Sequence, residues 1–270
     1  MRRDLEQCLY PTALSPRASA RSRALASCDP EPIIAVLEPL VTDERRQRLL
    51  AVVAARLEAV TLVLDAPHDP HNGAAVVRSA DAFGLSRVHV LERKERFAAA
   101  RAVSRGAERW VELVPWARAD ELAGALAASG HLLVATHPEG ELEVRDLAGL
   151  GRVALVLGNE HAGIGDDLRA ACGSSVRVPM RGFVESLNLS VTAAVLLSHA
   201  TAGRGGDLAP HERRRLYARF LVTSVGRSDA ILAERGIGLD AAPVDPASEA
   251  TAPHLPPPGG GGLDGRDETP

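Results

Sequence analysis

The chain has 270 residues, of which 46% are apolar and 24% are charged. This composition is typical of a globular protein and excludes a wholly disordered or fibrous chain. The net charge of −4 argues against nucleic-acid binding at first sight, but residues 240–270 carry six acidic residues and a single arginine. Residues 1–239 are therefore close to neutral, which leaves room for a local basic surface.

The three cysteines, Cys8, Cys28 and Cys172, are far apart and lack the spacing of a zinc site or of a disulfide framework. The first residues lack the apolar core of a signal peptide. No apolar run reaches the roughly 18 residues that a membrane-spanning helix needs. We therefore expect a cytoplasmic protein that has no membrane partner.

Composition and periodicity divide the chain into five regions. Residues 1–29 are rich in Ser, Arg, Pro and Ala without periodicity, and residues 240–270 contain runs of proline and glycine, so we expect disorder in both. Residues 30–58 have helical spacing that Pro39 interrupts, which predicts two short helices or one kinked helix. The remaining regions are a main domain over residues 59–203 and a C-terminal helical extension over residues 204–239.

The main domain alternates short apolar runs with helical segments. The predicted strands are Val60–Leu64, Val88–Leu91, Leu132–Ala135, Val153–Leu157 and Val176–Val178, with Trp110–Val114 as a further candidate. The predicted helices cover 73–83, 119–129, 164–171 and 188–202, and Gly84 can take the left-handed position after the first of them. This alternation predicts an α/β fold with a mostly parallel sheet and helices on both faces.

Polar residues and glycines collect just beyond four of the predicted strands. These segments are Asp65–Asn72, Thr136–Pro138, Gly158–Gly163 and Pro179–Asn188. Because ligands of open α/β sheets bind outside the carboxyl ends of the strands, the four segments predict one site.

Some common types of site do not fit these segments. Gly158–Gly163 is not a GxGxxG turn and lacks the Gly-Lys-Ser/Thr ending of a phosphate-binding loop, which disfavours a nucleotide-dependent oxidoreductase or an ATPase. His68, His71 and His161 have no cysteine or paired carboxylate to complete a ligand set, so we expect no metal. No GxSxG elbow is present to support a Ser-His-Asp hydrolase.

Three segments carry a family resemblance. They are His71–Gly84 (HNGAAVVRSADAFG), Leu155–Ile164 (LVLGNEHAGI) and Val178–Ala194 (VPMRGFVESLNLSVTAA). In composition, order and separation they resemble the SpoU branch of the SPOUT methyltransferases, a family with a C-terminal trefoil knot. The segment Ser104–Val111 and the two helical extensions are also similar to the tRNA 2′-O-methyltransferases of this branch that modify guanosine 18 in the D-loop.

The resemblance implies a methyl donor, ligands for it and a reaction. S-adenosylmethionine would be the methyl donor, held by Thr136, Gly158, Val178 and Leu187. Asn72 and Arg78 match the family's catalytic asparagine and arginine. Six residues along a helix place two side chains about 120° apart, so these two converge only if Asn72 precedes the helix. Because guanidinium stays protonated, we assign Arg78 to charge stabilisation and phosphate binding rather than to proton removal.

The resemblance also assigns roles to Glu160, Ser186 and Asn188, as catalytic or substrate-site residues. From the residues alone, Glu160 is equally a surface acid at the start of the 164–171 helix, and Ser186 or Asn188 is equally a helix N-cap. The C-terminal extension contains a run of arginines that favours either a solvated helix face or contact with the tRNA backbone: Arg213, Arg214, Arg215, Arg219, Arg227 and Arg235. Arg45, Arg46 and Arg48 present the same alternatives in the N-terminal extension.

The predicted function is methyl transfer from S-adenosylmethionine to a ribose 2′-hydroxyl of tRNA, at guanosine 18. Ribosomal RNA and the wobble nucleotide of tRNA are alternative substrates, and a non-catalytic RNA-binding protein is an alternative of another class. Family members are usually homodimers, so we expect a homodimer that binds RNA and no DNA.

Overall fold

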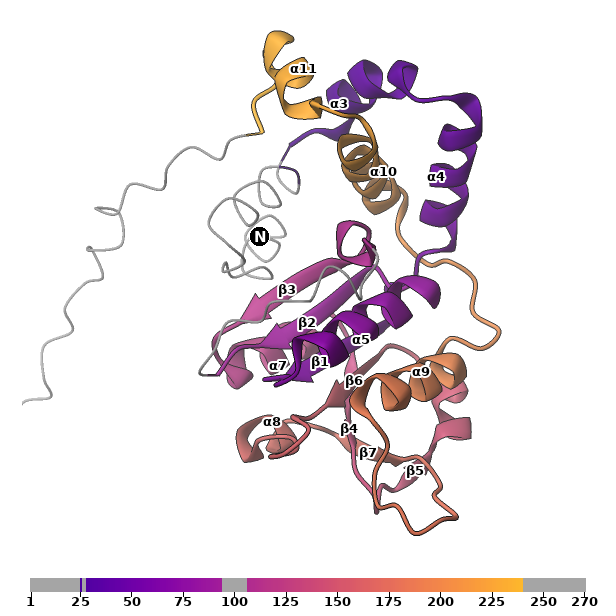
Figure 1. The fold of residues 1–270 in the computed structure, drawn as a ribbon, viewed down its shortest axis with the longest axis vertical. Helices are drawn as coiled ribbons and strands as arrows, with labels where there is room; N and C mark the ends of the chain where they lie inside the picture. The colour runs from indigo at the N-terminus through magenta and orange to yellow at the C-terminus, as the bar shows by residue number, and fades with distance from the viewer. Residues whose placement is uncertain (1–24, 26–27, 94–105, 240–270) are drawn as a thin grey trace, which may run out of the picture.

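A computed structural model describes Leu25 and residues 28–93 and 106–239. We expected disorder at residues 1–29 and 240–270. Apart from Leu25, Cys28 and Asp29, these lie outside the residues that the structure describes. No helix in the described ranges is long and apolar enough to cross a membrane. The described helices and strands follow the predicted α/β alternation, with helices added at both ends (Figure 1).

A seven-stranded parallel sheet forms the centre of the main domain. Its strands are β1 (Val60–Asp65), β2 (Arg87–Leu91), β3 (Glu112–Trp116), β4 (Leu132–Thr136), β5 (Leu142–Glu143), β6 (Val153–Leu157) and β7 (Ser174–Arg177). They lie in the order β3-β2-β1-β6-β4-β7-β5, and every pair is parallel. In β1, Leu62 pairs with Val88 of β2 on one side and with Leu155 of β6 on the other. The predicted sheet is therefore confirmed.

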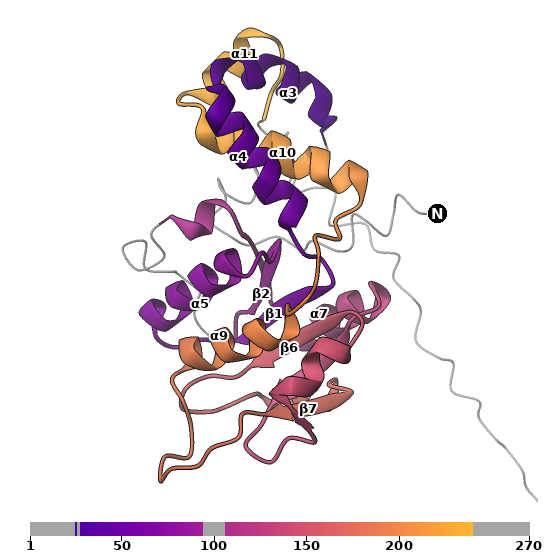
Figure 2. The same ribbon diagram turned by 90° about the vertical axis from the view of Figure 1, so that its right-hand side faces the viewer.

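Helices cover both faces of the sheet (Figures 1 and 2). Leu62 and Leu64 of β1 point into the core beneath α5 (Pro70–Ala82) and α9 (Leu189–Ala200). Val63, between them, points into the core beneath α7 (Ala119–Ala128) and α8 (Asp166–Ala170), because successive side chains of a strand face opposite sides. Two-sided burial explains why these strands appear in the sequence as uninterrupted apolar runs.

Three details differ from the sequence prediction. Helix α5 begins at Pro70, with Asp69 as its N-cap, so Asn72 lies inside the first turn and not before the helix. Strand β3 starts at Glu112 and includes Pro115, which an edge strand tolerates because one side of its backbone needs no partner. Strand β5, at the opposite edge, has only two residues, too few for a periodic pattern. Gly84 has a φ of 80°, as its left-handed position predicts.

The two terminal extensions pack together as one helical cluster. It contains α3 (Pro30–Leu37), the 3-10 turn η1 (Glu38–Leu40), α4 (Asp43–Ala55), α10 (Pro210–Ser224) and α11 (Ser228–Glu234). Ile33, Leu37, Val53, Phe220 and Leu232 bury their side chains in a core separate from the two cores of the sheet. In Figures 1 and 2 these helices lie together beyond one end of the sheet. Pro39 lies in η1, where it separates α3 from α4 as expected. Further 3-10 turns are η2 (Ala107–Arg109) and η3 (Val144–Gly149).

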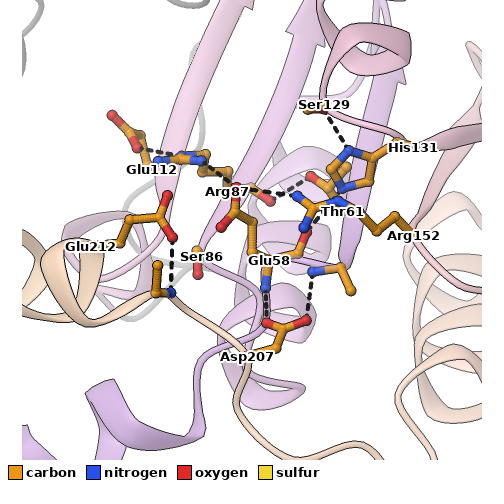
Figure 3. Close-up of polar contacts among 12 residues, drawn as sticks. Glu58, Thr61, Ser86, Arg87, Glu112, Ser129, His131, Arg152, Asp207 and Glu212 are labelled. Carbon is orange, nitrogen blue, oxygen red and sulfur yellow. Dashed lines mark hydrogen bonds and ion pairs between the residues drawn. The ribbon is translucent and has the colours of Figure 1, made fainter. Parts of the chain in front are cut away.

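A network of charged residues joins the amino ends of the strands to this helical cluster (Figure 3). The Asp207 carboxylate accepts hydrogen bonds from the backbone N–H groups of Glu58 and Ala59, directly before β1. Arg87, at the start of β2, pairs with Glu112 and Glu58 at 3.1 and 3.6 Å. Figure 3 also shows Glu212, whose carboxylate accepts from the Ala209 N–H at 3.1 Å and so caps α10. Structural contacts thus fill the end of the sheet at which the strands begin.

Arg56, at the end of α4, connects the core to the helical cluster. Its side chain is only 1% exposed. Its guanidinium donates to the Leu85 carbonyl at 2.8 Å, pairs with Asp81 at the end of α5, and lies 5.8 Å from the centre of the Phe220 ring of α10. The arginine therefore contacts both parts of the fold at once.

We predict that Arg56→Ala lowers the free energy of unfolding by about 3 kcal/mol, because it leaves the buried Leu85 carbonyl without its donor, removes a half-buried ion pair with Asp81 and opens a cavity. Urea denaturation followed by circular dichroism measures the change. Arg46→Ala is the matched control, since Arg46 and its partner Asp43 have side chains 42% and 86% exposed and such pairs contribute less than about 1 kcal/mol. Equal losses for the two variants would contradict a joining role for Arg56.

Candidate active site

Three of the predicted loops meet at the carboxyl ends of the parallel strands. The Asn159 side chain, after β6, donates to the Ala66 carbonyl after β1 at 2.6 Å. Glu160, its neighbour, accepts from Asn72 in α5, and Asn72 in turn accepts from Asn188 before α9. The loop after β4 lies against β7, where the His137 N–H donates to the Val176 carbonyl at 3.0 Å.

Asn188, Asn72 and Glu160 form a chain of directed hydrogen bonds. The Asn188 amide nitrogen donates to Asn72 Oδ1 at 2.9 Å, and the Asn72 amide nitrogen donates to Glu160 Oε1 at 2.9 Å. Because a carboxylate can only accept, it fixes the direction in which both amides point. We call this arrangement the amide chain. It brings together three of the five residues predicted to carry the reaction.

The carboxylate at the end of the amide chain is held in its charged form. Partial burial alone would raise the pKa of Glu160, but hydrogen bonds from Asn72 and from the His68 N–H lower that pKa below its usual value. Glu160 therefore remains an acceptor at neutral pH. Its side chain contacts Asn72 and His68, whereas the N-cap of α8 is Gly165, so the helix-cap alternative for Glu160 does not hold.

Asn188 is a helix N-cap, as its sequence position allowed, and it also bonds to Asn72. It is the N-cap of α9, where its Oδ1 accepts from the Ser190 backbone N–H at 2.8 Å and from the Ser190 hydroxyl at 2.6 Å. Its amide nitrogen is then free to point at Asn72. The cap thus orients the amide chain at its other end.

Arg78 lies on another side of α5, as the helix start at Pro70 requires. It is exposed and lines a groove between α5 and α9, with Ser79, Ser190 and Val191 among its neighbours. Its guanidinium makes no hydrogen bond or ion pair with another residue in the described ranges. Ser190 lines this groove and also bonds to Asn188, so Arg78 and the amide chain meet across the first turn of α9. The expected helix start at residue 73 was wrong, so the condition under which Asn72 and Arg78 converge, that Asn72 precedes the helix, is not met.

Three of the four residues predicted to hold a cofactor lie at the ends of β4, β6 and β7, and the fourth, Leu187, lies directly before the N-cap of α9. Thr136 ends β4 and pairs with Val176 of β7. Val178 is partly buried against the core, and Leu187 is 36% exposed beside Asn188. Gly158 follows β6 where the chain turns back, and a Cβ there would lie 2.3 Å from the backbone of Gly163. This close approach requires glycine at Gly158.

The predicted residue Ser186 is placed apart from the amide chain. It is exposed on the loop between β7 and α9 and has no hydrogen-bond partner within the described part of the chain. The backbone of residues 178–187 likewise makes no hydrogen bond to backbone described in the structure. The donors and acceptors of this loop are therefore available to a ligand.

Sequence reasoning did not nominate two further groups at this edge. The Asp65 carboxylate, 1% exposed, accepts from Arg93 at 2.6 and 2.9 Å and from the Gly165 N–H at 2.8 Å, which ties β1 to the turn after β6. Gly140 lies against β7, where a Cβ would stand 2.4 Å from the Val176 carbonyl carbon. The sequence shows Asp65 as a polar residue at the end of an apolar run. Its partners could not be predicted, because they lie 28 and 100 positions away in the sequence.

The comparisons with known proteins agree with this architecture. The SpoU rRNA Methylase family matches residues 59–198. A tRNA (guanosine(18)-2′-O)-methyltransferase of Borreliella burgdorferi is 30% identical over 166 residues, which cover 61% of this chain and 76% of the relative. A 23S rRNA (guanosine-2′-O-)-methyltransferase of Burkholderia is 33% identical over 169 residues, which cover 61% of this chain and 68% of the relative.

A solved structure supports the fold. The TrmH/SpoU tRNA modifying enzyme of A. aeolicus superposes with a TM-score of 0.56 at 23% identity, over 71% of this chain and 94% of the other. The family match begins just before β1 and ends within α9, so it contains the whole amide chain, Arg78 and the turn at Gly158. The chain therefore belongs to the SpoU methylase family and is a methyltransferase.

Proposed function

We propose that this protein transfers a methyl group from S-adenosylmethionine to a ribose 2′-hydroxyl of tRNA, at guanosine 18. The observation that carries the proposal is the amide chain, which Ser190 links to the groove that Arg78 lines. The relatives named as guanosine 2′-O-methyltransferases support the reaction. An RNA substrate of this kind also fits the expected cytoplasmic location.

The residues at the strand ends fit the methyl donor. An adenine edge needs one hydrogen-bond donor and one acceptor, and the backbone between Val178 and Leu187 has both available. The side chains of Met180 and Leu187, 37% and 36% exposed, offer apolar contact to a ring, and the Gly158 turn leaves no side chain in the way. Thr136, Gly158, Val178 and Leu187 would hold the donor, which supplies an electrophilic methyl group on a sulfonium.

In this proposal the amide chain and Arg78 act on the substrate ribose. Asn72 and Asn188 have fixed directions, so they can position the ribose and its phosphate without rearranging. Arg78 stabilises the negative charge that grows on the 2′-oxygen and binds a neighbouring phosphate. The proton of the 2′-hydroxyl leaves through phosphate or water, because the guanidinium cannot accept it. Ser186 lies in reach of the same substrate from the loop before α9.

The helical extensions support tRNA over ribosomal RNA, although only some of their arginines are free for it. Arg213 donates to the Leu208 carbonyl, Arg214 pairs with Glu31, and Arg219 donates to the Trp110 carbonyl, so these three hold the fold. Arg48, Arg227 and Arg235 are exposed without a partner among the described residues. We assign backbone contact with tRNA to these.

We predict that the protein forms 2′-O-methylguanosine at position 18 of a tRNA transcript, and that Arg78→Lys lowers kcat on the order of 100-fold. Lysine keeps the charge but loses the planar fork that stabilises the growing negative charge. Mass spectrometry of nucleosides after incubation with isotopically labelled donor measures the product and its position.

The matched control is Arg118→Lys, an exposed arginine that pairs with Asp120 at the start of α7, on the opposite face of the sheet from α5. Full activity of Arg78→Lys would show that the reaction does not need bidentate hydrogen bonding by the Arg78 guanidinium. Methylation of ribosomal RNA or of the wobble nucleotide instead would replace the proposed substrate. Failure of the protein to bind S-adenosylmethionine in calorimetry would favour the non-catalytic, RNA-binding alternative.

We also propose a homodimer that buries the groove between α5 and α9. Small residues of both helices line it, including Ala75, Ala82 and Ala194, which permits close approach of helices. Val191 at its edge is 46% exposed, and Phe183 and Val184 of the preceding loop are fully and 61% exposed. Contiguous exposed apolar surface of this kind is typical of protein interfaces. The partner subunit would then approach Arg78 itself.

We expect the protein to sediment as a dimer and Ala194→Glu to sediment as a monomer, since the carboxylate would be buried without a partner. Analytical ultracentrifugation measures both. Leu50→Glu, which places the same charge at a 41% exposed position on α4, should leave the dimer intact. A monomeric wild-type protein would contradict the proposal.

A further inference from the structure

Two histidines from distant segments form an exposed ring pair beside the amide chain. His68 precedes α5 and His161 follows β6, and their ring centres are 5.3 Å apart with an angle of 65° between the planes. Both side chains are exposed. Neither ring bonds through its nitrogens to another described residue, so these atoms face solvent. The contact is therefore not part of a core.

The position of this pair is fixed by the same groups that fix the site. The backbone N–H of His68 donates to Glu160 Oε2 at 3.0 Å, while the other oxygen of Glu160 accepts from Asn72. The backbone N–H of His161 donates to Asn159 Oδ1 at 2.9 Å, and Asn159 also bonds to the Ala66 carbonyl. The backbone of His68 is thus held by the carboxylate that ends the amide chain, and the backbone of His161 is held by the residue that precedes this carboxylate in sequence.

The surroundings favour an anion rather than a metal as the ligand. No group of three metal-binding side chains exists among the described residues, so the pair lacks the ligands of a metal site. Both oxygens of Glu160 already accept hydrogen bonds, and Asp69 accepts from the His71 N–H at 2.8 Å. These carboxylates are engaged with backbone and amide groups, which leaves the imidazole N–H groups as donors for an outside acceptor.

We infer that His68 and His161 form a subsite for a phosphodiester group of the RNA backbone, next to the ribose that is methylated. The inference rests on the proposed function, because it assumes that RNA lies over the amide chain. Each imidazole ring carries an N–H that can donate a hydrogen bond to a phosphate oxygen. Removal of both rings should therefore weaken RNA binding.

The test is the affinity of the full-length protein for a fluorescent tRNA transcript, measured by anisotropy without donor at constant pH and ionic strength. The double variant His68→Ala/His161→Ala should bind about tenfold more weakly than wild type, because it removes two hydrogen-bond donors. The double variant His68→Lys/His161→Lys keeps a donor at both positions and should bind tightly. His199→Ala, at the far end of α9 from Asn188, is the matched control and should bind like wild type.

Two outcomes overturn the inference. One is full affinity of the double alanine variant. The other is full affinity of His68→Phe/His161→Phe, which would make the rings a stacking platform for a base instead. Because binding is measured without methyl transfer, loss of the proposed reaction and loss of this subsite remain distinguishable.

Discussion

The hydrogen bond from Asn72 to Glu160 is the interaction on which the site depends. It joins α5 to the turn after β6, and the matching bond from Asn188 adds the loop after β7. The two bonds thereby fix the relative orientation of three segments, because the bonded residues lie 88 and 116 positions apart in the sequence. A carboxylate at the end of the chain removes the ambiguity that two amides alone would have, because it can only accept. The orientation of the amides is therefore set before any substrate arrives.

The residues at the amino ends of the strands differ in their contacts from those at the carboxyl ends. At the amino ends of the strands, Arg87 pairs with Glu112, and Asp207, just before α10, accepts from the N–H groups directly before β1. At the carboxyl ends, the backbone after β7 and the guanidinium of Arg78 are left without partners in the described structure. The structural contacts and the candidate site thus lie at opposite ends of the strands, which is the arrangement expected of an open parallel sheet.

Much of this fold could be predicted from local pattern. Two-sided burial makes strands such as Val153–Leu157 fully apolar, and polar residues directly after them indicate the site. The start of α5 was misplaced because Pro70 was taken as a loop residue, although proline is favoured in a first turn after a cap such as Asp69. That error displaced Asn72 from its helix. The family motifs supplied the expected roles of Asn72, Glu160 and Asn188, and these roles remain predictions. The trefoil knot and the domain boundaries remain predictions.

Long-range pairing could not be predicted at all. Nothing local distinguishes Arg93 or Arg213, which hold the fold, from Arg78 or Arg48, which are free within the described ranges. The same holds for Gly140, whose close approach to β7 depends on how two loops pack.

The measurement that tests the central claim most directly is single-turnover methyl transfer by Glu160→Gln, together with its affinities for donor and tRNA. If the carboxylate orients the amide chain, the rate of transfer should fall on the order of 100-fold while both affinities stay within about threefold of wild type, because misplacing positioned groups slows the chemical step. An unchanged rate, or a loss confined to binding, would contradict the account.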